Sequence, residues 1–438
     1  MRDVVFLVDD ITASGELVTV TDRIKSISEN WQENLYEKNK RYYSAFTGNR
    51  VKFVRLADAM SGSLDPNKRY FYFIPIEDWK CHMQIYFNII SRQTQAWMSD
   101  NGVSFYFAQD LEMYPNLDIN FFGNYLGWFL LCQHAHSLPT IPIYLAMCSG
   151  LSVKHAAPLQ KAFGSRIRYV FSPLLAVFSR EELASKHSSI DVTGIIRTYL
   201  STEKQKSYMA LTRDPKYHRL TMMHGLRAHY LLSDGYVSNL LQCRYDASHV
   251  SSPSNYAQRV IRDMPPNSEQ MPFMTVDSVR GDLAPGIFHG LGGDIPLDHM
   301  ARSCYDLVQE TATNYAGGPT VIDMTVLTEK VFKSLMLGRP FMVNGGQHCL
   351  RTLHRWGFQT FPMLFDESYD GLENFIDRQE VIVTNVSRWN RKYDDFMRVA
   401  GSRQVVSILE NNARRVQQFP LEETLISEID LAEKNSLL

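Results

Sequence analysis

Hydrophobic positions in the first half of the chain fall into short runs separated by longer mixed segments. Six runs rich in Val, Ile, Phe and Tyr have the length and composition of buried β-strands. They cover residues 4–8, 51–56, 70–76, 103–107, 141–146 and 167–171. Two of the intervening segments, residues 81–98 and 120–134, have helical character. Strands that alternate with helices predict a mostly parallel sheet with helices on both faces.

The second half of the chain repeats this alternation after a polar stretch at residues 179–207, where we place the connection between two domains. Strands are predicted at residues 208–211, 236–240, 305–309 and 340–343, helices near His218 and at 328–337 and 348–356, a long loop at 251–296, and a final helical region at 390–418. We therefore expect an α/β protein with two Rossmann-like domains facing a cleft, residues 1–200 and residues 201–438.

Composition narrows the class of protein. Hydrophobic residues make up 45% and charged residues 21%, which excludes a disordered, collagen-like or coiled-coil chain. With 45 basic and 47 acidic residues the net charge is −2, so there is no overall basic field for nucleic acid. The six cysteines form no C-x-x-C pair, and the most apolar segment, residues 121–132, is too short to span a bilayer. We expect a cytoplasmic protein (host cytoplasm if viral) without stable membrane association.

The predicted helix at residues 328–337 begins with the most informative residues of the chain. Thr328 can cap the helix, which places Glu329 and Lys330 in its first turn. A helix start offers free N–H groups to an anion, a glutamate there can accept hydrogen bonds from ribose hydroxyls, and a lysine supplies a charge for a phosphate. From spacing alone, an ordinary helix start with an exposed lysine is the alternative.

This segment resembles the donor-binding segment of nucleotide-sugar glycosyltransferases of the GT-B type. It is similar in particular to the α1,3-fucosyltransferase-like group, including related sequences of bacteriophages and bacteria. The resemblance is carried by Thr328-Glu329-Lys330, Phe332-Lys333, Gly338-x-Pro340-Phe341, Leu353-x-x-x-Gly357-Phe358-x-Thr360-Phe361, Phe365 to Asp370, the strand Tyr305 to Thr311 with its V-x-E-T element, and Leu211-Thr212-Arg213 with His218-Arg219. It covers about residues 208–378 and hardly any of the first half.

The resemblance implies a role for each matching residue. Glu329 would hold the donor ribose, and Lys330 and Arg219 would neutralise the leaving diphosphate. Arg213 is a second candidate for the phosphate, although the family often has Asn where this chain has Thr212. The chain contains no D-x-D triplet. We therefore expect no metal and no cofactor apart from the nucleotide-sugar co-substrate.

Glycosyl transfer also needs a base that removes the proton of the acceptor hydroxyl. The GT-B resemblance implies a carboxylate of the N-terminal domain. The candidates are Asp10, which follows the first strand, and Asp110 and Glu112, which follow the strand at residues 103–107. Asp110 and Asp10 rank level, because helix capping or a solvated turn explains each of them equally well.

A cluster of acids, Asp366, Glu367 and Asp370, has a further reading. It suits either a metal or acid/base site or a helix cap, and we favour the cap.

The sequence thus predicts a glycosyltransferase that moves a sugar from a nucleotide-diphosphate donor to a hydroxyl acceptor. The acceptor is open: a modified base in phage DNA and a glycan both remain. The alternative is a non-catalytic binding protein that retains the GT-B fold. The joint presence of Glu329, Lys330 and Arg219 favours the enzyme.

Overall fold

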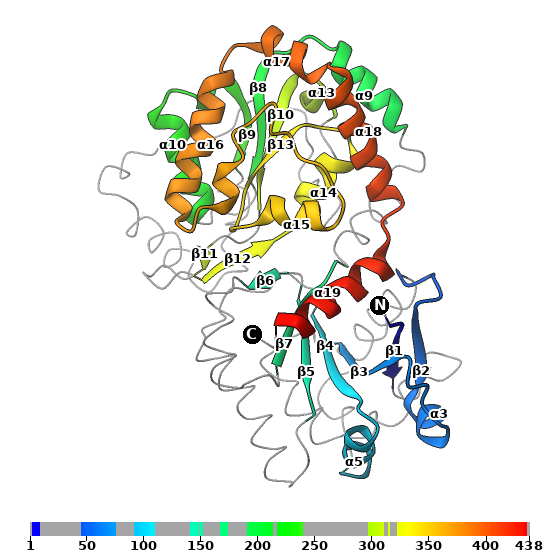
Figure 1. The fold of residues 1–438 in the computed structure, drawn as a ribbon. Helices are drawn as coiled ribbons and strands as arrows, with labels where there is room; N and C mark the ends of the chain where they lie inside the picture. Colours follow the sequence, from blue (N-terminus) through cyan, green and yellow to red (C-terminus); the bar gives the residue numbers. More distant parts are fainter. Residues whose placement is uncertain are drawn as a thin grey trace, which may run out of the picture. The chain divides into compact units, whose positions relative to one another are not determined.

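The computed structural model describes eleven stretches of the chain (Figure 1). These are residues 2–8, 45–75, 92–109, 141–147, 149–151, 167–173, 191–212, 217–239, 297–310, 314–315 and 322–435. They form two compact units, Met1–Leu174 with Pro420–Leu438, and Leu175–Phe419. This grouping differs from the division expected at residue 200, because helix α9 (Val192–Ser201) falls in the second unit and helix α19 (Leu421–Asn435) in the first.

The sheet of the first unit is parallel throughout. In spatial order it contains β2 (Val51–Arg55), β1 (Val4–Val8), β3 (Arg69–Pro75), β4 (Ser104–Gln109), β5 (Ile143–Met147) and β7 (Ile167–Phe171). The described part of this unit also has α3 (Leu56–Ser61), α5 (Arg92–Asp100) and β6 (Ser149–Leu151). All six strands predicted for this half are confirmed, with ends shifted by at most two residues.

Aromatic side chains fill the core of the first unit. All five residues of β1 are buried, as expected for a strand covered on both faces. The ring of Phe6 contacts those of Phe53, Phe73 and Tyr106, with centroid distances of 5.2, 5.1 and 4.8 Å. This packing explains why β1 is a continuous apolar run without the alternation of a half-exposed strand.

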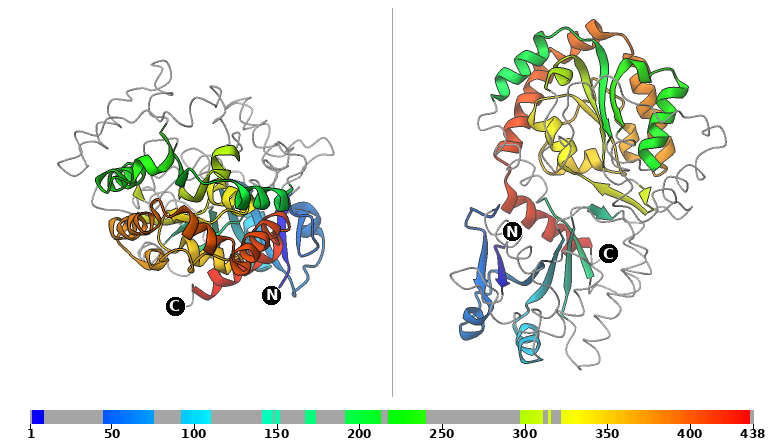
Figure 2. Two further views of the ribbon diagram at one scale, coloured as in Figure 1. Left: turned by 90° about the horizontal axis from the view of Figure 1, so that it is seen from above. Right: turned by 180° about the vertical axis from the view of Figure 1, so that it is seen from behind.

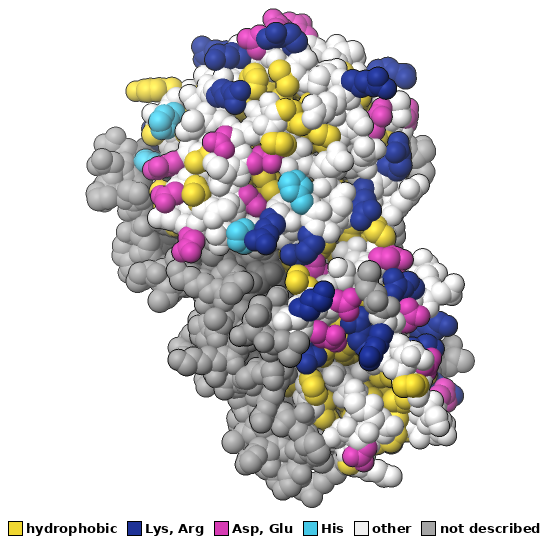
Figure 3. Space-filling model, in the orientation of Figure 1, with side chains coloured by type: hydrophobic (Ala, Val, Ile, Leu, Met, Phe, Trp, Pro, Cys, Tyr) yellow, Lys and Arg dark blue, Asp and Glu magenta, His cyan; other side chains and the backbone are white. Residues whose placement is uncertain are grey.

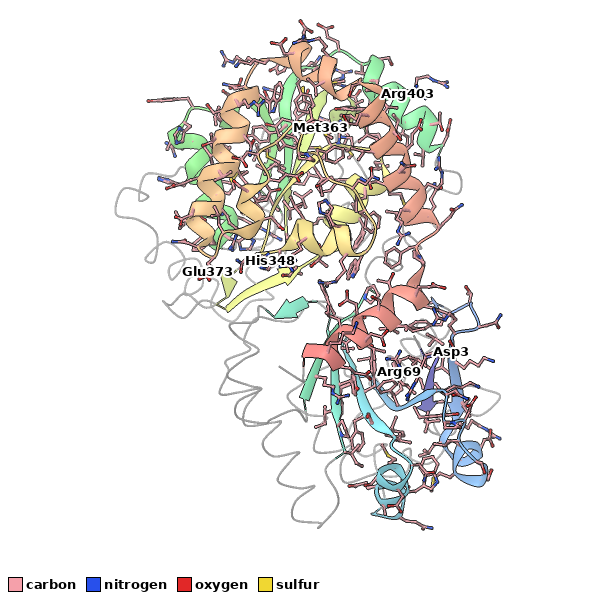
Figure 4. The ribbon with its side chains drawn as sticks, in the orientation of Figure 1. Asp3, Arg69, His348, Met363, Glu373 and Arg403 are labelled. Atoms are coloured by element: carbon pink, nitrogen blue, oxygen red, sulfur yellow. The ribbon has the colours of Figure 1, made fainter. Side chains whose placement is uncertain are left out.

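Polar contacts bind the last helix, α19, to the first unit. The carboxylate of Glu422 accepts hydrogen bonds from the backbone N–H groups of Gly48, Arg50 and Val51, at 2.7, 2.8 and 3.2 Å. A Cβ atom at Gly48 would lie 2.4 Å from this carboxylate, so the close approach requires glycine. Arg69 of β3, labelled in Figure 4, pairs with Asp430 at 2.5 Å. The C-terminal helix is therefore part of the first unit.

The second unit has a smaller parallel sheet (Figure 2). Its order is β13 (Phe341–Asn344), β10 (Ser303–Gln309), β8 (Lys206–Thr212) and β9 (Gly235–Asn239). The other described elements of the unit are α10 (Tyr217–Ala228), η2 (Leu232–Asp234), α13 (Leu297–Ala301), β11 (Asn314–Tyr315), β12 (Ile322–Val326), α14 (Glu329–Met336), α15 (Cys349–Arg355), η4 (Ser368–Gly371), α16 (Phe375–Trp389), α17 (Tyr393–Ala400) and α18 (Arg403–Gln417). The expectation of an α/β fold with parallel sheets is confirmed.

Helices cover both faces of this second sheet. Helices α10 and α16 lie on one face, and α9, α14 and α18 on the other (Figures 1 and 2). Gly225 lets α10 approach α16 closely, since a Cβ atom there would lie 3.2 Å from a methyl group of Val383.

Helix α16 was missed by the sequence prediction, which began the last helical region at residue 390. Asn374 caps it by accepting a hydrogen bond from the N–H of Ile376 at 2.9 Å. Its buried Ile382, Val383 and Val386 have helical spacing, so cap and pattern together were the available signal. The predicted helix at residues 120–134 and the predicted loop at 251–296 lie outside the described residues.

A buried ion pair ties the end of α14 to the start of β10. The side chains of Arg339 and Asp306 are 1% and 6% exposed, and Nη2 of Arg339 lies 3.0 Å from Oδ1 of Asp306. Ser334 of α14 donates to the other carboxylate oxygen at 2.8 Å, and Arg339 also donates to the carbonyl oxygen of Ser303 at 3.0 Å. A buried ion pair stabilises the fold only while each charge keeps its hydrogen-bond partners, so the loss of one partner is costly.

Asp306→Ala is expected to lower the free energy of unfolding of the second unit by about 3–5 kcal/mol, because Arg339 would keep a buried charge without its counterion. Urea unfolding measures the loss. Asp395→Ala, which breaks an exposed pair with Arg398, is the control and should change stability little. Equal losses in the two variants would contradict the dependence on Asp306.

Candidate functional site

The strand order of the second unit reverses between β8 and β10. Strand β8 has its successor β9 on one side and β10 on the other, and all of them run parallel. At such a reversal the connections after the two strands leave toward opposite faces of the sheet, and ligands bind at the carboxyl ends there. Strand β10 is followed directly by Glu310, and β8 by Arg213, which lies outside the described residues.

The start of helix α14 lies beside this point. Thr328 is its N-cap, as predicted, with its hydroxyl accepting from the N–H of Lys330 at 3.4 Å. The apolar face expected for the helix is confirmed, since Phe332, Leu335 and Met336 are buried. The carboxylate of Glu310 accepts from the N–H of Thr328 at 3.0 Å and from its hydroxyl at 2.6 Å. The helix start is thereby fixed at the end of β10.

Glu329 is a buried carboxylate with one oxygen unused. The residue is 9% exposed, and its Oε1 lies 2.7 Å from the ammonium of Lys330. Burial opposes the charged form, but the charge and hydrogen bond of Lys330, with the charge of Lys333, hold the pKa of Glu329 below its usual value. Its Oε2 is buried and has no hydrogen-bond partner among the described residues. An ionised oxygen in that position calls for a donor.

Lys330 contacts both neighbouring polar groups. Its Nζ lies 3.2 Å from the hydroxyl of Thr328 in addition to its bond with Glu329. Burial raises the pKa of Glu310, although the charge of Lys330 and the hydrogen bonds from Thr328 act in the opposite direction. The group thus combines two carboxylates, one ammonium and one hydroxyl at the carboxyl end of a parallel sheet.

Arg219 lies close to this group. It was expected to contact the diphosphate, but in the structure it binds backbone carbonyl oxygens. It is 2% exposed, and its Nε and Nη2 donate to the carbonyl oxygen of Glu310 at 3.1 and 2.9 Å. Nη2 also lies 3.3 Å from the carbonyl oxygen of Gln309, and a ring nitrogen of His218 lies 2.9 Å from that of Glu310. These contacts fix the end of β10. The phosphate contact expected for Arg219 stays a prediction.

A chain of buried amides occupies the same edge of the sheet. The side-chain amide of Asn344, the last residue of β13, donates to Oε1 of Gln309 at 2.6 Å. Gln379 of α16 donates to Oδ1 of Asn344 at 3.1 Å and to the carbonyl oxygen of His218 at 2.6 Å. Sequence reasoning missed these residues. For Gln379 the signal was hidden, because its helix was not predicted.

The remaining predicted site residues, Asp10, Asp110 and Glu112, lie outside the described residues, as does Arg213. Of the residues predicted for the donor site, the structure brings together Glu329 and Lys330, and Arg219 is linked to them through Glu310 and Thr328.

The acidic cluster after Phe365 makes structural contacts. Asp370 accepts from the N–H groups of Leu350 and Arg351, the first turn of α15, at 2.8 and 2.9 Å. Its carbonyl oxygen accepts from the N–H of His348, whose φ of 68° is left-handed and which Figure 4 labels. Asp366 accepts from the N–H of Ser368 at 2.9 Å. Asp370 therefore caps α15, a different helix from the one that follows Asp366, and η4 itself has Glu367 at its N-cap position without a side-chain cap hydrogen bond.

The described ranges also bear on metal binding and on membrane insertion. No group of three or more His, Cys, Asp or Glu in them could hold a metal ion. None of their helices combines the length and apolar character needed to cross a bilayer. No protein-family model, curated protein or solved structure matches this chain.

Asp370→Ala is expected to cost about 1–2 kcal/mol of stability, since it leaves two N–H groups of the first turn of α15 without their acceptor. Chemical denaturation measures the cost, and hydrogen exchange should become faster at Leu350 and Arg351. An unchanged stability would show that the carboxylate is not needed as a cap and would reopen its reading as an acid/base group.

Proposed function

We propose that this protein is a glycosyltransferase of the GT-B type, with the sugar nucleotide bound by the second unit at Glu329 and Lys330. The proposal joins the resemblance of residues 208–378 with the geometry at the start of α14. The sugar would pass from the diphosphate to a hydroxyl of an acceptor, without a metal ion.

The observation that carries the proposal is Oε2 of Glu329, which has no hydrogen-bond partner in the part of the chain that the structure describes. A buried, ionised carboxylate oxygen without a donor is costly, and a ligand hydroxyl removes that cost. The 2′- and 3′-hydroxyls of a ribose are neighbouring donors that suit the two oxygens of one carboxylate. The position at a reversal of strand order in a parallel sheet supports a nucleotide further.

The diphosphate would take Lys330 as a partner. In the structure its ammonium is held by Glu329 and Thr328, so phosphate binding exchanges one carboxylate partner for another anion. Arg213, one residue beyond the end of β8, would reach the same reversal point and add a second positive charge. Stabilising the charge that develops on the leaving diphosphate is the main electrostatic task of the reaction.

Asp10 and Asp110 are equally good candidates for the base on sequence grounds. The order of the strands supports Asp10. In the first sheet β1 lies between β2 and β3, so the order reverses at β1, and Asp10 follows that strand by two residues. Asp110 follows β4, which lies beyond β3. Asp10 is therefore the stronger candidate. As its carboxylate takes the proton, the acceptor oxygen bonds to the anomeric carbon and the bond to the diphosphate breaks.

The acceptor stays a choice between a base in DNA and a glycan. Lys and Arg are interspersed with Asp and Glu over the described part of the face in Figure 3, which has no continuous basic surface. Binding to DNA draws mainly on phosphate contacts, so this mixture of charges favours a glycan.

Removal of one ribose hydroxyl from the ligand tests the role of Glu329. Calorimetry first identifies the nucleoside diphosphate that binds. Its 2′-deoxy or 3′-deoxy form is then expected to bind about 10–150-fold more weakly, the range for a hydrogen bond to a charged group of about 1.5–3 kcal/mol. In Glu329→Ala both forms should bind with the same, low affinity.

Glu423→Ala, an exposed carboxylate of the first unit, is the control and should keep the full preference for ribose. If Glu329→Ala also keeps it, the ribose is bound elsewhere. If no nucleoside diphosphate binds the unmodified protein, the proposed donor site is wrong.

Turnover tests the base and separates an enzyme from a binding protein. Asp10→Asn is expected to lower the release of nucleoside diphosphate from the sugar nucleotide by about 10²–10⁴-fold, the usual contribution of a general base, with nucleotide affinity unchanged. Asp110→Asn should lower it far less. Binding without any release, in the unmodified protein and with DNA and glycan acceptors supplied, would support the non-catalytic alternative.

A further inference from the structure

Glu310 is held from three sides at the end of β10. Its N–H donates to the carbonyl oxygen of Asn344, the last residue of β13, at 3.1 Å. Its own carbonyl oxygen accepts from His218 and Arg219 of α10. With the backbone fixed by β13 and α10, the side chain has a defined direction, toward Thr328 at the start of α14.

The carboxylate of Glu310 decides which way the hydroxyl of Thr328 points. The residue is 0% exposed and its two oxygens take the N–H and the hydroxyl of Thr328. In its ionised form, which the charge of Lys330 and the hydrogen bonds from Thr328 favour against burial, the carboxylate only accepts hydrogen bonds, so the hydroxyl donates to it. Its lone pairs are then turned to the N–H and the ammonium of Lys330, at 3.4 and 3.2 Å.

A neutral amide of the same shape cannot orient the hydroxyl of Thr328 in this way. In Glu310→Gln one amide oxygen still accepts from the N–H of Thr328, but the NH₂ group faces the hydroxyl as a donor. The hydroxyl hydrogen then has to turn toward Lys330, whose ammonium has no acceptor to offer it. The charge of Glu310, and not only its shape, therefore orders the helix start.

We propose that Glu310 is a positioning residue for the nucleotide site: through the hydroxyl of Thr328 it orients Lys330, and with it Glu329. This inference rests on the proposed function for its ligand, although its effect on the helix start can be measured without one. Glu310 itself touches no reacting atom in this account.

The test compares Glu310→Gln with Glu367→Gln. Glu367 makes the same pair of bonds elsewhere in the unit, accepting from the hydroxyl of Thr360 and the N–H of Phe361, both at 2.7 Å. It therefore controls for the loss of one carboxylate with the same pair of bonds, although Glu367 is half-buried and Glu310 is fully buried. In Glu310→Gln we expect amide hydrogen exchange at Lys330 and Val331 to be about tenfold faster, as for the loss of one hydrogen bond. Glu367→Gln should leave these two amides unchanged.

The second readout is affinity for the nucleoside diphosphate. Glu310→Gln is expected to weaken it about tenfold, and Glu367→Gln to leave it unchanged. In a Thr328→Val background, Glu310→Gln should have no further effect, because the hydroxyl through which it acts is gone. Additive losses would overturn this route.

The two readouts separate failure of this inference from failure of the proposed function. If the unmodified protein binds no nucleotide, the proposed function fails, and the exchange rates alone decide the role of Glu310. Unchanged exchange at Lys330 in Glu310→Gln overturns the inference even where nucleotide binds. Faster exchange with full nucleotide affinity also overturns it, because the helix start would then move without consequence for the ligand.

Discussion

The second unit depends on one arrangement, in which strand β10 holds helix α14 at both ends. Successive side chains of a strand point to opposite faces, so Asp306 and Glu310, four residues apart, share a face. Asp306 binds Ser334 and Arg339 at the end of the helix, and Glu310 binds Thr328 at its start. Both carboxylates are buried, so each contact is costly to lose and hard to replace. Both ends of the helix are therefore tied to β10 by buried carboxylates.

This arrangement gives the start of α14 an unusual balance of charge. Glu310 and Glu329 are two buried carboxylates near the ammonium of Lys330, with the charge of Lys333 also acting on Glu329, and Oε2 of Glu329 has no hydrogen-bond partner among the described residues. A ligand that donates hydrogen bonds would suit this site better than a bare phosphate, which adds a further negative charge. Under the proposed function, the ribose would donate to the carboxylate of Glu329 and the phosphates would take Lys330 as a partner. Arg213, which follows β8 in the chain, is the second cation proposed for the phosphates.

Sequence reasoning predicted those elements whose signal is local. The strands were found from short runs rich in Val, Ile, Phe and Tyr, of which β1 is fully buried and continuously apolar. Helix α14 was found because Thr328 caps it and its apolar positions are periodic. Contacts made by tertiary structure could not be found in this way. Arg219 has the same place in the chain whether it faces a phosphate or the carbonyl oxygen of Glu310, and only the fold shows the latter contact. Glu310 belongs to the V-x-E-T element, but its hydrogen bond to Thr328 joins residues 18 positions apart in the chain, so no local pattern indicates it.

Both sheets share a strand order in which the first strand lies between the second and the third. In the first sheet this is β2-β1-β3, and in the second β9-β8-β10. Ligands of parallel sheets commonly bind at the carboxyl ends of the strands at such a reversal. Asp10 follows the first strand in one unit and Arg213 in the other. Under the proposed function, the base for the acceptor and a cation for the leaving diphosphate would come from corresponding positions in the two sheets, one acidic and one basic. The common strand order is the structural argument for choosing these two residues over others that follow strands.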